Sequence, residues 1–457
     1  MQRLLPLLLF CFVCASAARA QTAAATPQAV HTWKTIDGRS FQATLLKIRE
    51  PLIELRLPDG KAVTFPIARL SPEDQTFLKN SAAPATPATP ATAAASTPQP
   101  KATPPATPPP ASPSTTATRL PPEKRTWPPL VEVDSRAIEV KPISETGEGG
   151  KYLYRSQAFE FTSEDKLAGS VMKEIARTFE ATRALVEALP WCIEPKPPAG
   201  QALYQAKFYV SRESYIAAGG PSNSGGVYMT KDHVFRIPFP SLGLEMRGKT
   251  WFKNTDFKND TLVHEITHQM MNDYLPFLPT WVIEGTAEYT EMIPYNAGRF
   301  ITASHERGLK EYIKEAAKRG MTPAKVGSVV AHMNMTTPQW HERADTGAPE
   351  QFQLYFTSCL LVYYFSHLDG DGKGTRFFKY IDKIREGREA WAAFFQNPLV
   401  KMHPDGSFNF PGNLPLPTQK RGDQYGLEQL PILLDGRTPE QMQQAVIDGY
   451  KKIGVRW

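Results

Sequence analysis

The segment His264-Glu265-Ile266-Thr267-His268 combines residue types and a spacing that are suited to metal chemistry. Residues i and i+4 of an α-helix lie on the same face, one turn from each other. His264 and His268 are therefore expected side by side, where their imidazoles can bind a single Zn²⁺. Glu265 follows the first histidine, where its carboxylate can reach a water molecule at the metal without binding the metal itself.

The residues around this segment predict the helix that it needs. Asn259-Asp260-Thr261 offers side chains for an N-cap, and Pro276 is expected to end the helix. The apolar contacts of the helix are expected from Leu262, Val263, Ile266, Met270 and Met271. Because the same short pattern also arises by chance in chains of this length, a metal site needs a further ligand to support it.

Glu284 is the candidate for that further ligand. Catalytic zinc sites have three protein ligands and leave one coordination position for water. Glu284 follows His268 by sixteen residues. This separation allows the first helix to end, the chain to turn at Pro276 and Pro279, and a second helix to begin.

Taken together, the two segments resemble the gluzincin metallopeptidases, the clan of the thermolysin-like and aminopeptidase N-like enzymes. Their H-E-x-x-H pattern is followed by a Glu ligand, often within W-x-x-E-G-x-A-x-Y, which this chain matches at Trp281, Glu284, Gly285, Ala287 and Tyr289. The resemblance covers about 205–370. It implies an α+β domain with a small mixed sheet, active-site helices and a helical C-terminal half. It also implies a Zn²⁺ cofactor, a peptide or protein substrate, and Glu265 as the general base.

The resemblance assigns roles to further residues. In thermolysin-like enzymes a carboxylate one turn after the Glu ligand orients a zinc histidine, which implies this role for Glu288, with Asp273 as an alternative. In gluzincins a strand ahead of the zinc helix pairs with the substrate backbone. Gly226, Val227 and Tyr228 are the matching residues, and an ordinary hairpin is the alternative interpretation.

A hydrogen-bond donor must also stabilise the oxyanion that forms during peptide hydrolysis. Family members use a Tyr or His on a later helix, and Tyr355 is our first candidate, as a catalytic residue rather than a packing residue. The alternatives are Tyr363, His332, His341 and His367.

The catalytic unit is expected to occupy residues 130–457. Its expected strands lie at 131–140, within 152–162, at 206–210 and at 232–238, and its expected helices at 166–189, 309–319 and 351–367. Pro190 should end the first of these helices. Pro238 is typical of an edge strand, because proline cannot donate a ladder hydrogen bond.

Residues 1–20 are typical of a secretory signal, with Arg3 ahead of an apolar run and Ala18-Arg19-Ala20 at the cleavage site. The chain is therefore expected to be secreted or to reside in the periplasm or cell envelope. No other stretch is apolar enough for a transmembrane helix. Many of the 42 prolines lie in the Pro/Thr/Ala-rich segment 81–129, which predicts an extended linker.

A small module at residues 30–80 precedes this linker. Short strand-like runs separated by Asp37-Gly38 and Asp59-Gly60 predict a small β-barrel. The module resembles the Sla-type homology domain, an SH3-like barrel, at Trp33, Asp37-Gly38, Leu57, Asp59-Gly60-Lys61, Leu70-Ser71 and Glu73-Asp74. The resemblance implies a spacer or a module that binds protein or a component of the cell envelope.

Two cysteines remain after the signal segment, Cys192 and Cys359. Export permits a disulfide between them, and two separate buried thiols are the alternative. Asp369-Gly370-Asp371-Gly372 resembles the start of a calcium loop, but Tyr380 stands where such a loop needs Glu, which favours a glycine-rich helix end.

The net charge of +6 is small and spread along the chain, without a basic run, which argues against nucleic-acid binding. The sequence thus predicts an exported zinc peptidase. Two alternatives remain open. The first is an inactive metallopeptidase-like binding protein of the cell envelope. The second is a zinc hydrolase that acts on a bond other than a peptide bond.

Overall fold

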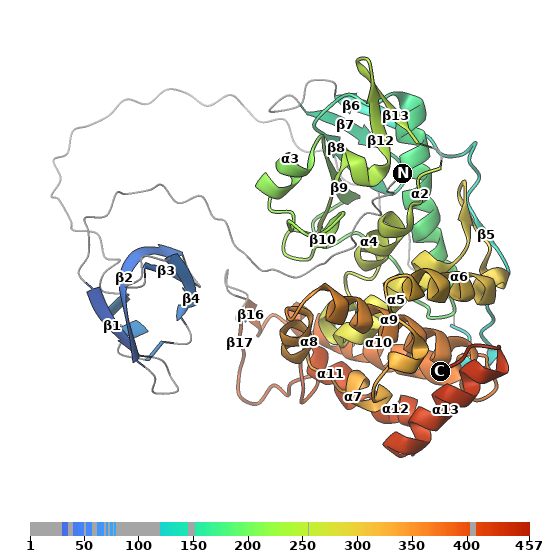
Figure 1. Ribbon diagram of the computed structural model, residues 1–457. Coiled ribbons are helices and arrows are strands. Elements are labelled where there is room, and N and C mark those ends of the chain that lie inside the picture. The colour runs from blue at the N-terminus through green and yellow to red at the C-terminus, as the bar shows by residue number, and fades with distance from the viewer. Residues whose placement is uncertain are drawn as a thin grey trace. The chain divides into compact units, whose positions relative to one another are not determined.

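The computed structural model describes residues 30–34, 40–49, 52–56, 62–67, 70–71, 74–75, 77–78, 119–144, 151–254, 256–402 and 408–457. The chain divides into two compact units, one holding the small N-terminal sheet and the other holding the residues from 119 onward (Figure 1). The predicted signal segment, most of the predicted linker and both predicted turns of the small module lie outside the described residues. Among the described residues, no helix is both long and apolar enough to cross a membrane.

The small unit contains a four-stranded antiparallel sheet whose strands follow their order in the chain. Its strands are β1 (Val30–Lys34), β2 (Ser40–Arg49), β3 (Leu52–Arg56) and β4 (Ala62–Pro66). Trp33, Ile53, Leu55 and Leu70 form its buried core. Within the sheet each strand pairs with its neighbours in sequence, and the outer side of β1 accepts a further hydrogen bond of 2.8 Å from Ser71 N–H to Lys34 O. Among the described residues β1 and β4 do not pair with each other, so these strands do not form the predicted closed barrel.

The large unit is mixed α+β and contains a six-stranded sheet in the order β10-β11-β9-β8-β7-β6. Its strands are β6 (Lys141–Ser144), β7 (Tyr152–Arg155), β8 (Phe159–Ser163), β9 (Tyr204–Tyr209), β10 (Val227–Met229) and β11 (Val234–Pro238). The pairs β8–β9 and β9–β11 are parallel and the others are antiparallel. Helix α2 (Gly169–Ala188) makes the crossover between β8 and β9, and its apolar face lies in the core.

The strand predicted at 131–140 is not continuous. Only β5 (Val131–Glu132) is extended there, and it pairs with β15 (Arg299–Phe300). A turn follows, in which Ala137 N–H donates to Asp134 O at 2.9 Å and Arg136 N–H donates to the Asp134 side chain at 2.8 Å. Aspartate stabilises turns in this way. The alternation of apolar and polar residues at 131–140 therefore does not correspond to a single strand.

The prediction that residues 232–238 form an edge strand was wrong. β11 pairs with β9 on one side and with β10 on the other. Pro238 is tolerated because it is the last residue of β11. The pairing of β11 with β10 ends at Arg236, which lies opposite Val227, so Pro238 lies beyond that pairing. The edge of the sheet is therefore β10, which contains two of the predicted substrate-binding residues.

Two helices carry the predicted metal ligands, α4 (Asp260–Met270) and α5 (Thr280–Met292). The predicted side-chain N-cap is absent from α4, because the Asn259 Oδ1 atom instead accepts a hydrogen bond from Lys253 Nζ at 3.1 Å. α4 ends before Pro276, which lies in the 3-10 turn η4 (Leu275–Phe277). The reversal between the two helices is therefore made by η4 and the residues around it.

Helices dominate the C-terminal half, as Figure 1 shows. They are α6 (His305–Ala317), α7 (Val329–Met333), α8 (Thr337–Ala344), α9 (Ala348–His367), α10 (Thr375–Gln396), α11 (Asp423–Glu428), α12 (Leu430–Leu434) and α13 (Pro439–Lys452). The remaining α-helix of the described residues is the short α3 (Arg212–Ala217), and the remaining strands are β12 (Leu244–Arg247), β13 (Thr250–Lys253), β14 (Tyr295–Asn296), β16 (Lys401–Met402) and β17 (Phe408–Asn409). The apolar helix α9 is central and packs against α5.

Gly285 allows this close packing of α5 and α9. A Cβ atom added at Gly285 would lie 2.5 Å from the backbone oxygen of Ser358. We expect Gly285→Ala to lower the free energy of unfolding by about 1–3 kcal/mol, because the helices must separate to accept the methyl group. Urea unfolding would measure this loss. The matched control is Gly169→Ala at the start of α2, where nothing lies within 4 Å of the added atom. Equal stabilities of the two variants would contradict the prediction.

Residues 119–129, which the sequence predicted as the end of the linker, belong to the large unit. Arg125 is buried, and its Nη2 atom lies 2.7 Å from Asp382 Oδ2 on α10. Trp127 Nε1 donates to Lys373 O at 3.1 Å, and its ring lies at a tilt of 42° to the His367 ring, with centroids 4.4 Å apart. The folded unit therefore begins before the predicted boundary, because these side chains need the helical surface to cover them.

Cys192 and Cys359 are both free thiols rather than a disulfide; Cys359 is buried, as the thiol alternative predicted, whereas Cys192 is only half-buried. Asp369 does not offer a calcium site. Its carboxylate lies 3.0 Å from Arg376 Nη1 and 2.9 Å from Arg437 Nη1. These two guanidinium groups compensate the charge of the buried Asp369 carboxylate. This pairing agrees with the interpretation of the segment as a helix end.

Candidate metal centre

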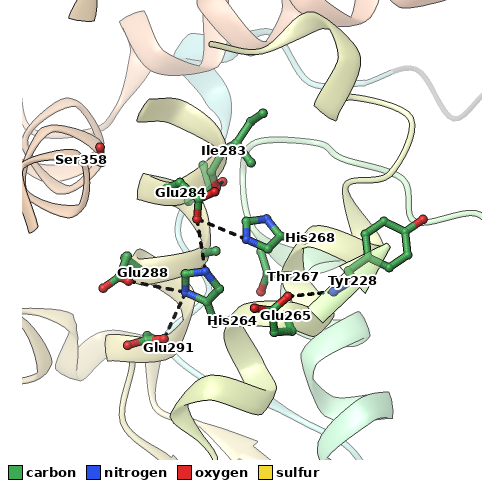
Figure 2. Close-up of polar contacts among 12 residues, drawn as sticks. Tyr228, His264, Glu265, Thr267, His268, Ile283, Glu284, Glu288, Glu291 and Ser358 are labelled. Carbon is green, nitrogen blue, oxygen red and sulfur yellow. Dashed lines mark hydrogen bonds and ion pairs between the residues drawn. The ribbon is translucent and has the colours of Figure 1, made fainter. Parts of the chain in front are cut away.

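The packing of α4 against α5 brings the three predicted ligands together (Figure 2). His264 Nε2 lies 3.3 Å from Glu284 Oε2, and His268 Nε2 lies 3.4 Å from the same oxygen. The two helices are also joined by a hydrogen bond of 2.7 Å between the hydroxyl groups of Thr267 and Thr290. Both His residues and Glu284 therefore converge from two neighbouring helices, as their spacing in the sequence predicted.

The donor atoms fit a zinc ion. The three ligand atoms lie within 4.8 Å of one another, and His264, His268 and Glu284 are each at most 3% exposed. Two nitrogens and one carboxylate oxygen are a ligand set of catalytic zinc sites, which leave a position for water. Glu284 Oε1 is buried and has no hydrogen-bond partner among the described residues. A buried carboxylate oxygen without a donor is costly, and a bound cation would compensate it.

The carboxylates of the group favour a positive charge beside them, which either a proton on a histidine or a metal ion can supply. Burial alone would raise the pKa of Glu284, but the nearby His268 and the hydrogen bonds from His264 and His268 lower that pKa to about 2. Burial would lower the pKa of His264, whereas Glu284 and Glu291 raise it well above its usual value. Glu284 is therefore a carboxylate at neutral pH, the protonation state that a metal ligand needs.

Glu265 lies between the histidines and the edge strand β10. Its Oε2 atom accepts a hydrogen bond of 2.9 Å from the backbone N–H of Tyr228. Burial raises the pKa of Glu265, although the nearby His268 and His264 act in the opposite direction. A carboxyl group with a raised pKa, buried beside the candidate ligands, is suited to accept and return a proton.

The predicted substrate-binding residues lie at this edge of the sheet. Val227 and Tyr228 belong to β10, and Gly226 precedes it. Tyr228 is 1% exposed and its hydroxyl donates to Asn272 Oδ1, so any contact of Tyr228 with a substrate must come from its backbone. An added Cβ atom at Gly226 would approach Arg236 O to 3.3 Å, a tight contact that favours glycine.

Glu288 lies near the metal centre, as predicted, but another carboxylate is closer to His264. Glu288 Oε1 is 3.6 Å from His264 Nδ1, whereas Glu291 Oε2 is 3.2 Å from it. Burial and the charge of Glu291 raise the pKa of Glu288 to about 8. Sequence reasoning missed Glu291. The helical spacing of Glu284, Glu288 and Glu291 could have indicated it, because residues i, i+4 and i+7 share one helix face.

Asp273, the alternative to Glu288, has partners other than His264 and His268 among the described residues. Its Oδ1 atom accepts a hydrogen bond of 2.9 Å from Asn272 Nδ2, and its Oδ2 atom lies 3.4 Å from Arg388 Nη1. Asp273 follows the end of α4, where its side chain is directed to these partners instead.

Tyr355, the first candidate for the oxyanion donor, lies on α9 with its ring centroid 6.2 Å from that of His264. His341, on α8, is also close enough for Glu284 to affect its pKa, which burial lowers. The other three candidates form hydrogen bonds within the helical half: His332 to Ser358 at 2.9 Å, His367 to Tyr289 at 2.8 Å, and Tyr363 to His305 at 3.0 Å. Tyr355 is thus in ring contact with a candidate ligand, and His341 is near enough to Glu284 to be affected by its charge.

His332 predicts a pH-dependent stability. Burial lowers its pKa to about 3, whereas a histidine of the unfolded chain titrates near 6.5. Between these values the unfolded state binds a proton that the native state does not, so stability decreases as the pH falls below about 6.5. We expect the wild-type protein to lose about 2 kcal/mol more between pH 7 and pH 5 than His332→Gln loses. Urea unfolding at both pH values measures this difference, and identical pH dependences would contradict it.

No family model matches this sequence, and neither does any curated protein. The metal centre is therefore inferred from its donor atoms, their burial and their positions on two packed helices.

Proposed function

We propose that this protein is an exported zinc-dependent peptidase. The observation that carries this proposal is the convergence of His264 Nε2 and His268 Nε2 on Glu284 Oε2, at 3.3 and 3.4 Å. This three-ligand set leaves one zinc position for water, which is the arrangement of a catalytic rather than a structural site. The adjacent carboxylate of Glu265 supports an enzyme, because a structural zinc site does not require it.

Each residue of the proposed active site has a separate role in peptide hydrolysis. Zinc, when bound, supplies a Lewis acid that polarises the carbonyl group and makes a water molecule more acidic. Glu265 takes a proton from the attacking water and returns it to the leaving amine. Tyr355 donates a hydrogen bond to the carbonyl oxygen as that oxygen gains negative charge. The outer edge of β10, on which the Tyr228 N–H donates to Glu265, aligns the substrate backbone through its remaining backbone groups.

The proposal extends to the rest of the chain. The large unit has a gluzincin-type fold. Three features support this assignment: the six-stranded mixed sheet, the two ligand helices and the helical C-terminal half. The small unit, whose four described strands form an antiparallel sheet, is a module that binds protein or a component of the cell envelope. The signal-like segment 1–20 supports export.

Incubation of the zinc-loaded protein with a diverse peptide library, followed by mass spectrometry, tests the function. We expect cleavage that a chelator abolishes and that added zinc restores. Zinc binding without cleavage of any peptide would overturn the proposal. It would favour an inactive binding protein, or a hydrolase of another bond if ester or amide substrates were consumed instead.

A further inference from the structure

His264 contacts carboxylates at both of its ring nitrogens (Figure 2). Its Nε2 atom faces Glu284 Oε2 at 3.3 Å, whereas its Nδ1 atom faces Glu291 Oε2 at 3.2 Å and Glu288 Oε1 at 3.6 Å. All three carboxylates lie on α5, and they share the face that packs against α4. One of the two carboxylates on the Nδ1 side must therefore fix the orientation of the ring.

The proton on Nδ1 requires an acceptor. A neutral imidazole that binds a metal through Nε2 carries its proton on Nδ1. The side chain of His264 is only 4% exposed, so protein atoms rather than bulk water must accept this proton. A buried donor without an acceptor costs about 1–3 kcal/mol, and a ring without this restraint could turn its Nε2 atom away from the other ligands.

Glu288 accepts its hydrogen bond from a different donor. The Tyr312 hydroxyl, from α6, donates to Glu288 Oε2 at 2.6 Å. The other oxygen of Glu288 is 3.6 Å from His264 Nδ1, which is too long for a hydrogen bond. Glu291 Oε2 lies within hydrogen-bond distance of Nδ1, and Glu291 has no other hydrogen-bond partner among the described residues.

We propose that Glu291, rather than Glu288, is the positioning residue that accepts the Nδ1 proton of His264 and thereby directs Nε2 toward the metal. Glu288 acts one step further away, where its bond to Tyr312 links α5 to α6. This inference rests on the proposed zinc site. It departs from the assignment that the family resemblance implied, in which the carboxylate one turn after Glu284 has this role.

The same donor atoms allow a different arrangement that the experiment must distinguish. His264 Nδ1 and the carboxylates of Glu288 and Glu291 lie within 4.8 Å of one another and could hold a second metal ion. In that case His264 would bridge two ions and lose both ring protons. Two zinc ions per chain, with one lost in Glu291→Gln, would overturn the positioning role.

Glu291→Gln and Glu288→Gln form a matched pair, because each replaces a carboxyl group on the Nδ1 side of His264 by an amide of nearly the same volume. Zinc affinity is measured by competition with a chromophoric chelator. We expect Glu291→Gln to weaken zinc binding by about 10–100-fold and Glu288→Gln to weaken it much less. Equal effects, or a larger effect of Glu288→Gln, would overturn the inference.

A second readout does not depend on hydrolysis. In protein labelled with ¹⁵N-histidine, the Nδ1–H resonance of His264 is assigned by its loss in His264→Ala. We expect this resonance to shift in Glu291→Gln and to stay unchanged in Glu288→Gln. If the wild-type protein hydrolyses peptides and both Gln variants bind zinc equally, only this inference fails. If the wild-type protein binds no zinc, the proposed function fails, and the resonance of the metal-free protein still decides which carboxylate is the acceptor.

Discussion

Glu265→Gln should lower kcat/KM for peptide hydrolysis by roughly 10²–10⁴-fold, the usual contribution of a general base, while the zinc content stays unchanged. The substitution preserves the shape of the side chain. Its amide oxygen can still accept the hydrogen bond from Tyr228 N–H, which the Glu265 carboxylate accepts at 2.9 Å. The variant loses only the ability to take a proton. Steady-state kinetics and metal analysis of the same preparation measure both quantities.

Glu180→Gln is the matched control. Glu180 is a buried glutamate of α2 that accepts hydrogen bonds from Ser156 Oγ and Ala158 N–H, both at 2.8 Å, and it is not one of the metal-centre residues. This control should retain full activity, apart from any loss of stability. Substantial activity in Glu265→Gln would remove the proposed general base and favour an arrangement in which another group accepts the proton.

Glu284→Ala should release the zinc ion. Structural zinc sites bind with about 10–16 kcal/mol over four ligands, so the loss of one ligand should cost about 3–4 kcal/mol, or roughly several hundred-fold in affinity. His264→Ala should have a similar effect. Hydrolysis should disappear in both variants at limiting zinc, and the metal content after dialysis should fall well below that of the wild type.

Glu306→Ala serves as the control for zinc binding, because Glu306 is a half-exposed residue of α6 that pairs with Lys310 at 2.6 Å. Its zinc content should equal that of the wild type. If Glu284→Ala also retained its zinc, the two histidines would have to bind the metal with a different third ligand, and the assignment of Glu284 would fail.

The convergence of His264, His268 and Glu284 was predictable from the sequence because its geometry is largely local. The spacing of His264 and His268 sets their relation within one helix, and the short reversal before Trp281 limits where Glu284 can lie. Glu291 was missed although it shares the helix face of Glu284, because a contact between α4 and α5 decides which carboxylate reaches His264 Nδ1. Distances across a helix pair are properties of tertiary packing, and the spacing of residues within one helix does not determine them.

The errors in the fold prediction have similar causes. The alternating residues of 131–140 favoured a strand, but the turn made by Asp134 interrupts it. Pro238 favoured an edge strand, yet the terminal position of that proline within β11 removes the conflict with an interior strand. In both cases a single side-chain or positional detail outweighed the average preference of the segment.

The anchoring of Arg125 and Trp127 also determines how the large unit should be isolated. A truncated fragment that begins at residue 130 would remove the Arg125 guanidinium from beside Asp382 and would uncover the ring of His367. A fragment that begins before Arg119 keeps the contacts of Arg125 and Trp127 intact. Recombinant production of the large unit without the small unit should therefore start the chain before Arg119.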